Sequence, residues 1–520
     1  MRIGIDVGGT NTDAVLMDGE TVVAAYKTPT TENVETGVIR ALREVLGASG
    51  TDPAEIVAVM IGTTHFTNAV VERRRLLEVG AIRLGLPATR SLPPFSDWPG
   101  DLAQALGRHS WMLRGGHEFD GREIAPLDEK GLMEAIGEIR ARGLRSVAIS
   151  SVFSPVSATM EERAAEILRE ELPDVAVTES HQIGRIGFLE RENAAIMNAS
   201  LAELAGRVVA SFEKALREMK ISAPFFISQN DGTLMQPDFV ARFPVLTFAS
   251  GPTNSMRGAA RLAGLADAMV VDIGGTTSDV GMLMQGFPRE SAVSVDIGGV
   301  RTNFRMPDVL AIGLGGGSLV RDDGARIGPD SVGYQLTEKA RVFGGDTLTT
   351  TDIIVAAGLE EIGDSARVAD VPASVVKTAL ARMETMVDEA VDRMKTSAEP
   401  LPVVLVGGGA ILIRDRISSA SQLVRPENAS VANAIGAAIA QVGGEVDRVF
   451  SMEGQSREAV LNMAKSEAMD RAREAGARPE TIKVIDIEEV PLAYLPGSAT
   501  RIRVKAVGDL AIAPAPVPAA

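Results

Sequence analysis

Cysteine is missing from the 520 residues of this chain. Its absence excludes disulfides, zinc–thiolate centres, iron–sulfur clusters and cysteine nucleophiles. Only four histidines are present, so a bound metal has to rely mainly on oxygen ligands. Hard cations such as Mg²⁺ suit that set of ligands best.

Long apolar runs and an excess of basic charge are also missing. No stretch approaches roughly 18 uninterrupted apolar residues, and Asp6 stands where a secretory signal needs an apolar run. The 52 basic and 69 acidic residues give a net charge of −17, which repels nucleic-acid phosphates and anionic lipids. We therefore expect a cytoplasmic protein that binds neither nucleic acid nor membranes.

Aromatic residues make up only 4% of the chain, while hydrophobic and charged residues make up 45% and 23%. These values are typical of a folded globular protein, here with a core of Val, Ile, Leu, Ala and Met. At roughly 150 residues per domain, the length predicts two to four domains. Short β-branched runs followed by glycine alternate with amphipathic stretches such as 159–171 and 373–394, which indicates an α/β fold.

A short motif occurs twice. Residues 6–13 read Asp-Val-Gly-Gly-Thr-Asn-Thr-Asp and residues 272–279 read Asp-Ile-Gly-Gly-Thr-Thr-Ser-Asp, so five of the eight positions are identical. Each copy follows one strand-like run and leads into another, which predicts a β-hairpin in each place. Two copies so far apart along the chain imply two similar halves.

The tip of such a hairpin can hold phosphate groups. Glycine lets the chain turn sharply, so backbone N–H groups meet a ligand at close range. The threonine hydroxyl is a further donor, and the aspartate that opens the motif faces a cation bound to the phosphates. An ordinary turn is the alternative for a single copy, whereas two matched copies favour phosphate binding. Residues 296–299 repeat Asp-Ile-Gly-Gly without the threonine, and we interpret them as a plain turn.

Glycines later in the chain add a second signal. The apolar run 402–406 predicts a strand that ends in three glycines, and residues 430–441 predict a helix of small side chains. Together they leave a flat slot for a planar base, although tight helix–strand packing explains the same pattern. Residues 313–318 miss the G-x-G-x-x-G fingerprint, and no G-x-x-x-x-G-K-[ST] occurs. Nicotinamide cofactors and P-loop nucleotide binding therefore lack their usual motifs.

The hairpin, its copy and the late triple glycine together resemble the actin, sugar-kinase and heat-shock ATPase superfamily. A finer series of motifs resembles the hydantoinase A / 5-oxoprolinase family, from residue 3 to about residue 440. The series consists of residues 3–13, 62–69 (Gly-Thr-Thr-His-Phe-Thr-Asn-Ala), 120–124 (Asp-Gly-Arg-Glu-Ile), 127–128 (Leu-Asp), 190–193 (Glu-Arg-Glu-Asn), 250–252 (Ser-Gly-Pro), 272–279, 313–318, 407–409 and 433–436.

The resemblance implies an α/β fold with two duplicated actin-like (ribonuclease H-like) ATPase domains around a nucleotide cleft. We expect these domains at 1–185 and 186–442. A small α+β region follows at 443–510, with a predicted helix at 456–475 and predicted strands at 481–487 and 500–507, and the Pro/Ala-rich residues 511–520 are expected to be a disordered tail.

Members of that family couple ATP hydrolysis to the opening of cyclic amides or to the carboxylation of ketones. The resemblance therefore implies an ATP- and Mg²⁺-dependent hydrolase subunit that phosphorylates a hydantoin, 5-oxoproline or a lactam, beside a hydantoinase B-like second subunit. Three alternatives stay open: an ATP-dependent carboxylase subunit, a nucleotide-dependent regulatory module without turnover, and a free sugar or acyl kinase.

The resemblance also implies roles for individual residues. Asp6 and Asp272, expected at solvent-facing hairpin tips, are the metal ligands. Asp6, Asp13, Asp272 and Asp279 are the catalytic candidates, although Asp13 and Asp279 could equally cap turns. The nucleotide-binding candidates are Gly8, Gly9, Thr10, Asn11, Thr12, Gly274, Gly275, Thr276, Thr277 and, facing the adenosine, Gly407, Gly408, Gly409 and Asn433. The substrate candidates are Thr63, Thr64, His65, Asn68, Gly315 and Gly316.

Two positions depart from the family pattern. Leu310 stands where the family usually has the histidine of an Asp-x-His pair, so a metal or polar substrate site carried by that pair would lack its histidine. His65 and Phe66 replace the common Val-Ala. His65 is predicted to lie in a loop, either beside the substrate or as a structural hydrogen-bonding residue. The other histidines lack metal-ligand spacing, and residues 190–192 precede a predicted helix and could be only its charged first turn.

Overall fold

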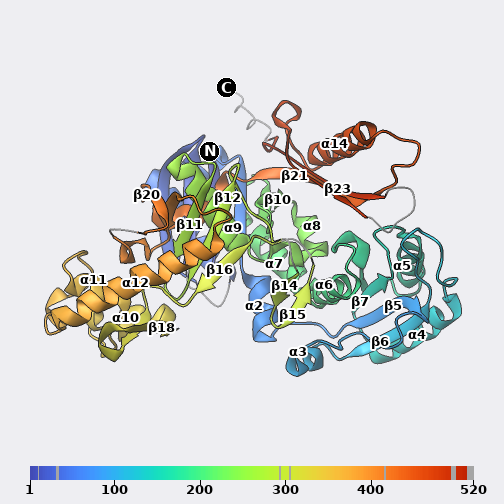
Figure 1. Cartoon of the computed structure of the whole chain (residues 1–520), viewed down its shortest axis with the longest axis horizontal. Coiled ribbons are helices and arrows are strands. Elements are labelled where there is room, and N and C mark those ends of the chain that lie inside the picture. The colour runs from blue at the N-terminus through green and yellow to red at the C-terminus, as the bar shows by residue number, and fades with distance from the viewer. Residues whose placement is uncertain are drawn as a thin grey trace.

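The computed structural model describes residues 1–9, 11–30, 34–291, 294–303, 306–414, 417–492 and 499–511. The helices are α1 Val34–Ser49, α2 His65–Glu72, α3 Gly100–Ala105, α4 Glu129–Arg142, α5 Thr159–Glu171, α6 Phe188–Ser200, α7 Ala202–Glu218, α8 Pro237–Arg242, α9 Ser250–Ala263, α10 Leu336–Lys339, α11 Thr350–Ala356, α12 Ala373–Met394, α13 Ala432–Ala438 and α14 Arg457–Glu474. Helices α10 to α12 lie at one end of the long axis, and α4 and α5 lie at the other (Figure 1).

A nine-stranded sheet joins distant parts of the chain. Its strands are β1 Arg2–Val7, β2 Asn11–Asp18, β3 Thr21–Pro29, β4 Ala58–Thr63, β9 Phe225–Ser228, β10 Thr233–Met235, β21 Gln441–Phe450, β22 Lys483–Pro491 and β23 Thr500–Gly508. Their order is β22-β23-β21-β10-β9-β4-β1-β2-β3. The sheet takes strands from each of the three folded regions expected from the sequence, and the domain limits at 185 and 442 stay a prediction.

A second sheet repeats the start of the first. Its strands are β11 Ala268–Ile273, β12 Ser278–Met284, β13 Phe287–Pro288, β16 Val309–Ile312, β19 Leu401–Val406 and β20 Ala420–Val424. The hairpin β11–β12 is antiparallel and β19 runs parallel to β11, as β4 runs parallel to β1 beside the hairpin β1–β2. The predicted α/β fold with duplicated hairpins is confirmed.

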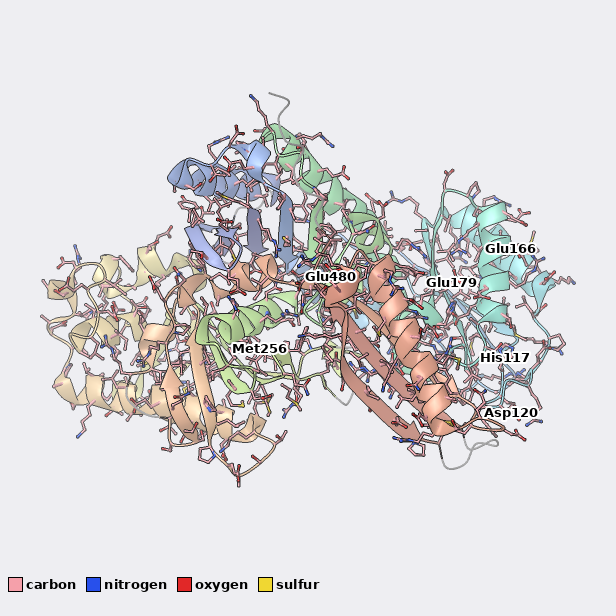
Figure 2. The ribbon with its side chains drawn as sticks, turned by 90° about the horizontal axis from the view of Figure 1, so that it is seen from above. His117, Asp120, Glu166, Glu179, Met256 and Glu480 are labelled. Atoms are coloured by element: carbon pink, nitrogen blue, oxygen red, sulfur yellow. The ribbon has the colours of Figure 1, made fainter. Side chains whose placement is uncertain are left out.

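A parallel four-stranded sheet forms a separate unit, with the order β6-β5-β7-β8. Its strands are β5 Gly80–Leu86, β6 His109–Arg114, β7 Ser146–Ser151 and β8 Ala176–Glu179. Two further pairs of strands form two-stranded ribbons elsewhere, β14 Val295–Ile297 with β15 Val300–Thr302 and β17 Ser318–Arg321 with β18 Arg326–Ser331. Seen from above, His117, Glu166 and Glu179 of this unit lie together at one side, whereas Met256 of α9 lies nearer the middle of the molecule (Figure 2).

Helix α6 ties this unit to the rest of the chain. Arg191 and Glu192 lie inside the helix and are buried, so the interpretation of residues 190–192 as only a charged first turn before a helix is wrong for these two. Glu192 accepts a hydrogen bond from Nε of the buried Arg83 at 2.8 Å and another from Ser150 at 2.6 Å. A buried ion pair that is fully hydrogen-bonded in this way holds α6 against the sheet.

Helix α13 is shorter than the predicted helix at 430–441, and Gln441 already opens β21. Its small residues serve close packing. A Cβ on Gly436 would lie 1.8 Å from the carbonyl oxygen of Asn254 on α9, and a Cβ on Gly4 of β1 would lie 2.1 Å from the carbonyl oxygen of Ala434. Only glycine permits these close approaches, so the small residues of this stretch are explained by tight packing of α13 between α9 and β1.

The C-terminal region follows the prediction closely. The predicted helix at 456–475 is α14, whose N-cap is Ser456, and the two predicted strands are β22 and β23. The expected tail lies outside the described residues from 512 onward. Among the described residues, every helix is too short or too polar to cross a membrane.

Candidate functional site

Residues of both hairpins line one cavity of about 440 Å³. The predicted residues that line it are Asp6, Gly8, Gly9, Asn11, Asp13, Asp272, Gly274, Gly275, Thr276, Thr277, Asp279, Gly316, Gly407, Gly408, Gly409 and Asn433. Thr10 lies outside the described residues. Thr12 is buried behind the turn, where its hydroxyl lies 3.2 Å from that of Thr30.

The two tips have the same backbone geometry. Gly8 donates its N–H to the carbonyl oxygen of Asn11 at 3.0 Å, and Gly274 donates its N–H to that of Thr277 at 2.9 Å. A Cβ added to Gly9 or Gly275 would meet no atom closer than 3.9 Å. The tips are therefore open towards the cavity, as a phosphate-binding turn requires.

The four aspartates form two cross-strand pairs. Asp6 is the direct partner of Asp13 across β1–β2, and Asp272 is the direct partner of Asp279 across β11–β12. Asn433 donates its side-chain amide to Oδ2 of Asp6 and to Oδ2 of Asp13, each at 2.9 Å. Asn433 thus lies at the acidic end of the cavity. Its predicted contact with the adenosine stays a prediction.

Burial changes the acidity of these groups. Asp6 is only 4% exposed, so the expectation of a solvent-facing tip is wrong for this residue. Burial, with the charge of Asp13, raises the pKa of Asp6 to about 7. Burial, with the charge of Asp272, likewise raises the pKa of Asp279 to about 7, and burial raises the pKa of Asp272.

A cation would fit between the acids. Among the described residues, Oδ1 of Asp6 and Oδ1 of Asp13 are buried and have no hydrogen-bond partner. No group of three or more acidic or histidine side chains is arranged as a metal site in the described part of the chain. Mg²⁺ commonly uses one or two carboxylates together with phosphate oxygens and water, so the acids suit a cation that arrives with a nucleotide.

The three glycines 407–409 differ in what surrounds them. A Cβ on Gly407, whose φ is +83°, would lie 2.3 Å from Oδ1 of Asp272, and a Cβ on Gly409 would lie 2.6 Å from the Ile273 side chain. Both positions therefore need glycine so that the turn can pack against β11. A Cβ on Gly408 would meet nothing within 4 Å, which leaves this backbone open to the cavity. Apolar side chains lie in the same cavity, namely Leu336, Ile362, Ile411 and Leu412.

The glycine-rich segment 313–318 supports the second tip. Gly316 and Gly317 donate their N–H groups to the carbonyl oxygens of Gly274 and Gly275, at 3.0 and 2.7 Å. A Cβ on Gly315 would lie 2.5 Å from the backbone nitrogen of Thr276. Of the two predicted substrate residues, Gly316 lines the cavity, whereas Gly315 packs against the tip.

Leu310 lies in a regular strand. On β16 it is the cross-strand partner of Val280 of β12, and its side chain packs against the hydrophobic core of the second sheet.

The other substrate candidates lie where β4 meets α2, outside the lining of the cavity. His65 is the first residue of α2, so the predicted loop is wrong. Its Nδ1 lies 2.8 Å from the hydroxyl of Thr63, and burial, with the charge of Arg75, lowers the pKa of His65 to about 4. Asn68 donates to the hydroxyl of Thr64 at 3.4 Å. Their role towards a substrate stays a prediction.

Sequence reasoning missed Lys27, which lies on β3 as the direct partner of Asp13 and forms an ion pair with it at 2.9 Å. Continuing the strand alternation from β2 into β3 would have placed a lysine opposite this aspartate. It also missed Ser255 and Thr351, which line the cavity. Neither residue belongs to a local motif, because α9 and α11 reach the site only through the fold.

The sequence comparisons find the same family over most of the chain. Residues 2–172 match the hydantoinase/oxoprolinase N-terminal region, and residues 191–361 match hydantoinase/oxoprolinase. The chain is 31% identical over 381 residues to the caprolactamase subunit alpha of Pseudomonas jessenii, covering 69% of this chain and 54% of that protein. It is 27% identical over 392 residues to the acetophenone carboxylase gamma subunit of Aromatoleum aromaticum, covering 68% of this chain and 53% of that protein.

The chain thus spans about half the length of these curated relatives. The crystal structure of the ATP-dependent caprolactamase from Pseudomonas jessenii superimposes with a TM-score of 0.81 at 22% identity, covering 100% of this chain and 89% of that chain. This likeness shows a common fold.

Proposed function

This chain belongs to the hydantoinase/oxoprolinase family, and we propose that it is the ATP-handling subunit of a hydrolase that phosphorylates a cyclic amide for ring opening. The observation that carries the proposal is the cavity in which two matched hairpins bring four aspartates together. The identity of 31% to a caprolactamase subunit adds support for a lactam or a related ring.

The chemistry explains why ATP is needed. A cyclic amide resists water because resonance makes its carbonyl carbon a weak electrophile. Transfer of the γ-phosphoryl group to the amide oxygen breaks the bond between that group and ADP and gives an imidate-like phosphate, whose phosphate group can then leave. Catalysis of this transfer consists mainly of positioning and charge neutralisation.

The residues of the cavity suit these tasks. The open tips at Gly9 and Gly275 would bind phosphate oxygens, and the apolar side chains beside Gly408 would bind the base. Asp6 and Asp272 would hold Mg²⁺, which neutralises phosphate charge when bound.

Asn433 and Lys27 keep the first pair of acids in place. Asp279, with a pKa of about 7, would take up and release protons near neutral pH.

A second polypeptide would supply the hydrolytic half of the reaction. Both curated relatives are subunits by name, and this chain spans about half their length. We propose a hydantoinase B-like partner and a cytoplasmic location for the complex.

A carboxylase subunit is the second candidate, because of the identity of 27% to an acetophenone carboxylase subunit. ATPase assays with Mg²⁺ distinguish the candidates. Stimulation by caprolactam, hydantoin or 5-oxoproline supports the cyclic-amide hydrolase, and turnover that requires a ketone with bicarbonate supports the carboxylase. ATP hydrolysis that no substrate stimulates, with or without a partner subunit, contradicts both and leaves a regulatory module.

A further inference from the structure

Lys27 is a basic side chain in a cavity that is otherwise acidic. Four aspartates of the two hairpins line this cavity, and among the residues that the structure describes Lys27 is the only basic residue that lines it. Its side chain is 35% exposed, so a ligand in the cavity can reach it. A nucleotide adds further negative charge beside the four acids, and phosphoryl transfer depends on neutralising that charge.

Three adjacent strands place Lys27 in a row with two of the acids. Asp6 of β1 is the direct partner of Asp13 of β2, and Asp13 is the direct partner of Lys27 of β3. Directly paired residues project their side chains from the same face of a sheet. The residue that follows β3 is fastened to the first tip, because Thr30 donates its hydroxyl to the carbonyl oxygen of Gly8 at 2.7 Å. Lys27 is therefore held beside the turn that is suited to phosphate.

The ammonium group of Lys27 has N–H groups to spare. One N–H donates to Oδ2 of Asp13 at 2.9 Å, and Asn433 donates to the same oxygen at 2.9 Å. No other described residue forms a hydrogen bond with the ammonium group, which has three N–H donors. Two donors are thus available to a ligand, while Asp13 fixes the direction of the third.

Lys27 acts on both hairpins. Its ion pair with Asp13 belongs to the first hairpin. Burial raises the pKa of Asp272 of the second hairpin, whereas a hydrogen bond from Ser255 and the charge of Lys27 act to lower it. The ammonium group therefore lies close enough to the acids of both hairpins to reach a phosphoryl group that their tips hold.

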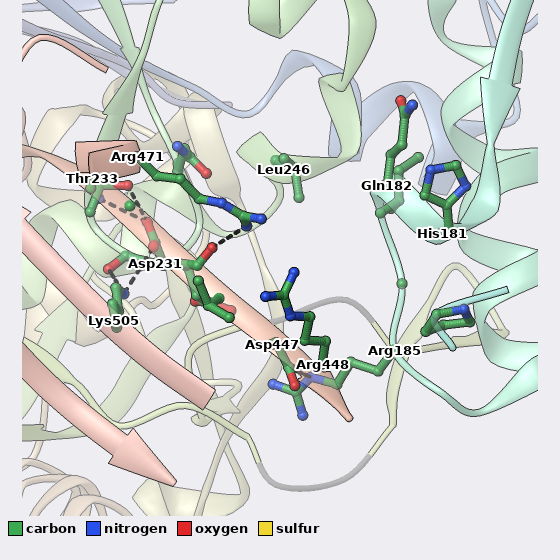
Figure 3. Close-up of a pocket in the computed structure, with 18 of the residues that line it drawn as sticks. His181, Gln182, Arg185, Asp231, Thr233, Leu246, Asp447, Arg448, Arg471 and Lys505 are labelled. Carbon is green, nitrogen blue, oxygen red and sulfur yellow. Dashed lines mark hydrogen bonds and ion pairs between the residues drawn. The ribbon is translucent and has the colours of Figure 1, made fainter. Parts of the chain in front are cut away.

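Lys505 shows how a purely structural lysine is bound in this chain. It lies in a larger cavity of about 900 Å³, where Figure 3 shows it beside Asp231. Its ammonium group has three acceptors: the carboxylate of Asp231 at 2.9 Å, the carbonyl oxygen of Asp231 at 3.3 Å and the carboxylate of Glu290 at 3.4 Å. Its side chain is only 5% exposed. Lys27 has one acceptor and a far more exposed side chain, so its surroundings are those of a ligand-binding group.

We propose that Lys27 is a catalytic residue that binds the γ-phosphoryl group of ATP and neutralises its charge during transfer. The inference rests on the proposed function, since it assumes that ATP occupies the cavity. Transfer breaks the bond between the γ-phosphorus and the oxygen that bridges to ADP, which keeps the electron pair, and forms a bond from phosphorus to the amide oxygen. Lys27 donates two N–H groups to the phosphoryl oxygens and keeps its protons. Asp13 is the positioning residue that holds the third N–H.

The first test compares two ligands of the purified full chain by calorimetry. MgADP occupies the site without a γ-phosphoryl group, and MgADP with aluminium fluoride mimics the group in transfer. Wild type should bind the fluoride complex at least tenfold more tightly than MgADP. Lys27→Met should lose most of this preference, with a change of less than about threefold in the affinity for MgADP, because the lysine acts on the transferring group. A residue that only kept β3 in place would alter both affinities alike.

Steady-state ATPase assays should show the same separation. Lys27→Met should lower kcat about 100-fold and change the KM for ATP by less than about threefold. Lys27→Arg keeps the positive charge and should retain part of the preference for the fluoride complex, which keeps the test decisive if Lys27→Met folds poorly. Lys214→Met is the matched control, because Lys214 forms an ion pair with Glu35 at 2.9 Å and does not line the cavity.

The outcomes separate this inference from the proposed function. A wild-type chain that prefers the fluoride complex, together with a Lys27→Met variant that keeps the preference and the kcat, overturns the inference and leaves the proposed function standing. Parallel loss of both affinities in Lys27→Met and Lys27→Arg also overturns it, since the lysine would then be structural. A wild-type chain that binds neither ligand contradicts the proposed function and the inference with it.

Discussion

The four aspartates of the hairpins occupy equivalent positions but have different neighbours. Asp13 has a counter-ion in Lys27 and shares Asn433 with Asp6, which gives the first pair one positive neighbour and one amide. Asp279 has its pKa raised to about 7 by burial and by the charge of Asp272. Asp6 and Asp279 are thus the two hairpin acids whose pKa lies near neutral pH, so each can exchange a proton when no cation is bound.

Replacement of the first aspartate of either hairpin tests the metal assignment. Asp6→Asn and Asp272→Asn should each reduce ATP turnover at least tenfold, because an amide binds Mg²⁺ far more weakly than a carboxylate does. Steady-state ATPase assays over a range of Mg²⁺ concentrations measure the effect. Glu20→Gln, at an exposed position after β2, is the control. Full activity in both variants would contradict the assignment.

The raised pKa of Asp6 predicts a pH dependence of stability. A carboxyl with a folded pKa of about 7 and an ordinary unfolded pKa of about 4 binds its proton more tightly in the folded state, so wild-type stability falls as pH rises between these values. Asp6→Asn removes this loss. The melting temperature of the variant relative to wild type should therefore increase from pH 5 to pH 8 in metal-free buffer. A difference in melting temperature that does not change with pH would mean that ionisation of Asp6 does not destabilise the folded state.

At the scale of elements, the three glycines of the turn after β19 have different surroundings. Gly407 and Gly409 pack against β11, whereas Gly408 leaves its backbone accessible to a nucleotide. Gly408→Val should weaken nucleotide binding at least tenfold while the fold survives, because Gly408 lines the cavity and, unlike Gly407 and Gly409, leaves room for a Cβ. Gly409→Val should instead lower the melting temperature, since its Cβ would lie 2.6 Å from Ile273. Nucleotide titration and thermal unfolding of both variants distinguish the two effects. Unchanged affinity in Gly408→Val would make the triple glycine a packing device only.

Elements with a strong local signal were predictable from the sequence. The amphipathic stretches 159–171 and 373–394 are α5 and α12 with the same limits, and both hairpins lie where the repeated motif places them. In contrast, the stretch 430–441 has mostly small residues, and the limits of its helix depend on how closely α9 approaches. No local pattern specifies such a tertiary contact.

Residues of the site divide in the same way. Those within the two motifs were predictable, because glycine turns and their aspartates leave a local signature. Lys27 was not, since its ion pair with Asp13 depends on a partner that the fold brings near. The burial of Asp6 was missed for a related reason: the lengths of β1 and β2 do not show that α13 covers their end.

At the scale of the whole molecule, ion pairs between charged side chains connect the C-terminal strands to the rest of the chain. Lys505 of β23 is 4% exposed and pairs with Asp231 of the β9–β10 turn at 2.9 Å and with Glu290 at 3.4 Å. Asp231 is partly buried, which acts to raise the pKa of its carboxyl, but the charge and hydrogen bond of Lys505 lower that pKa to about 2. The region after residue 442 is therefore part of the same folded body as the β9–β10 turn.

Lys505→Met should lower stability by about 3 kcal/mol, because it leaves Asp231, whose side chain is only 14% exposed, without its ion-pair partner, whereas Glu290 keeps its pair with Arg503. Chemical unfolding at neutral pH measures the change. Lys483→Met, on the exposed edge strand β22, is the matched control and should change stability by less than about 0.5 kcal/mol. Equal effects of the two substitutions would mean that the buried pairs contribute nothing specific.

The last prediction concerns the division of the reaction between chains. Ring opening needs two chemistries, phosphorylation of the amide oxygen and attack by an activated water. The described residues bring together an arrangement for the first in the hairpin cavity, whereas the sequence has no cysteine and no histidine cluster for a hydrolytic metal. We expect the isolated chain to bind ATP and to hydrolyse it slowly, but to open no lactam or hydantoin until a partner polypeptide is added. Product formation is followed by mass spectrometry with Mg-ATP, after the preparation has been checked for co-purified protein. A single carboxylate can activate water, so stoichiometric ring opening by the pure chain would show that one of its own acids performs the second step.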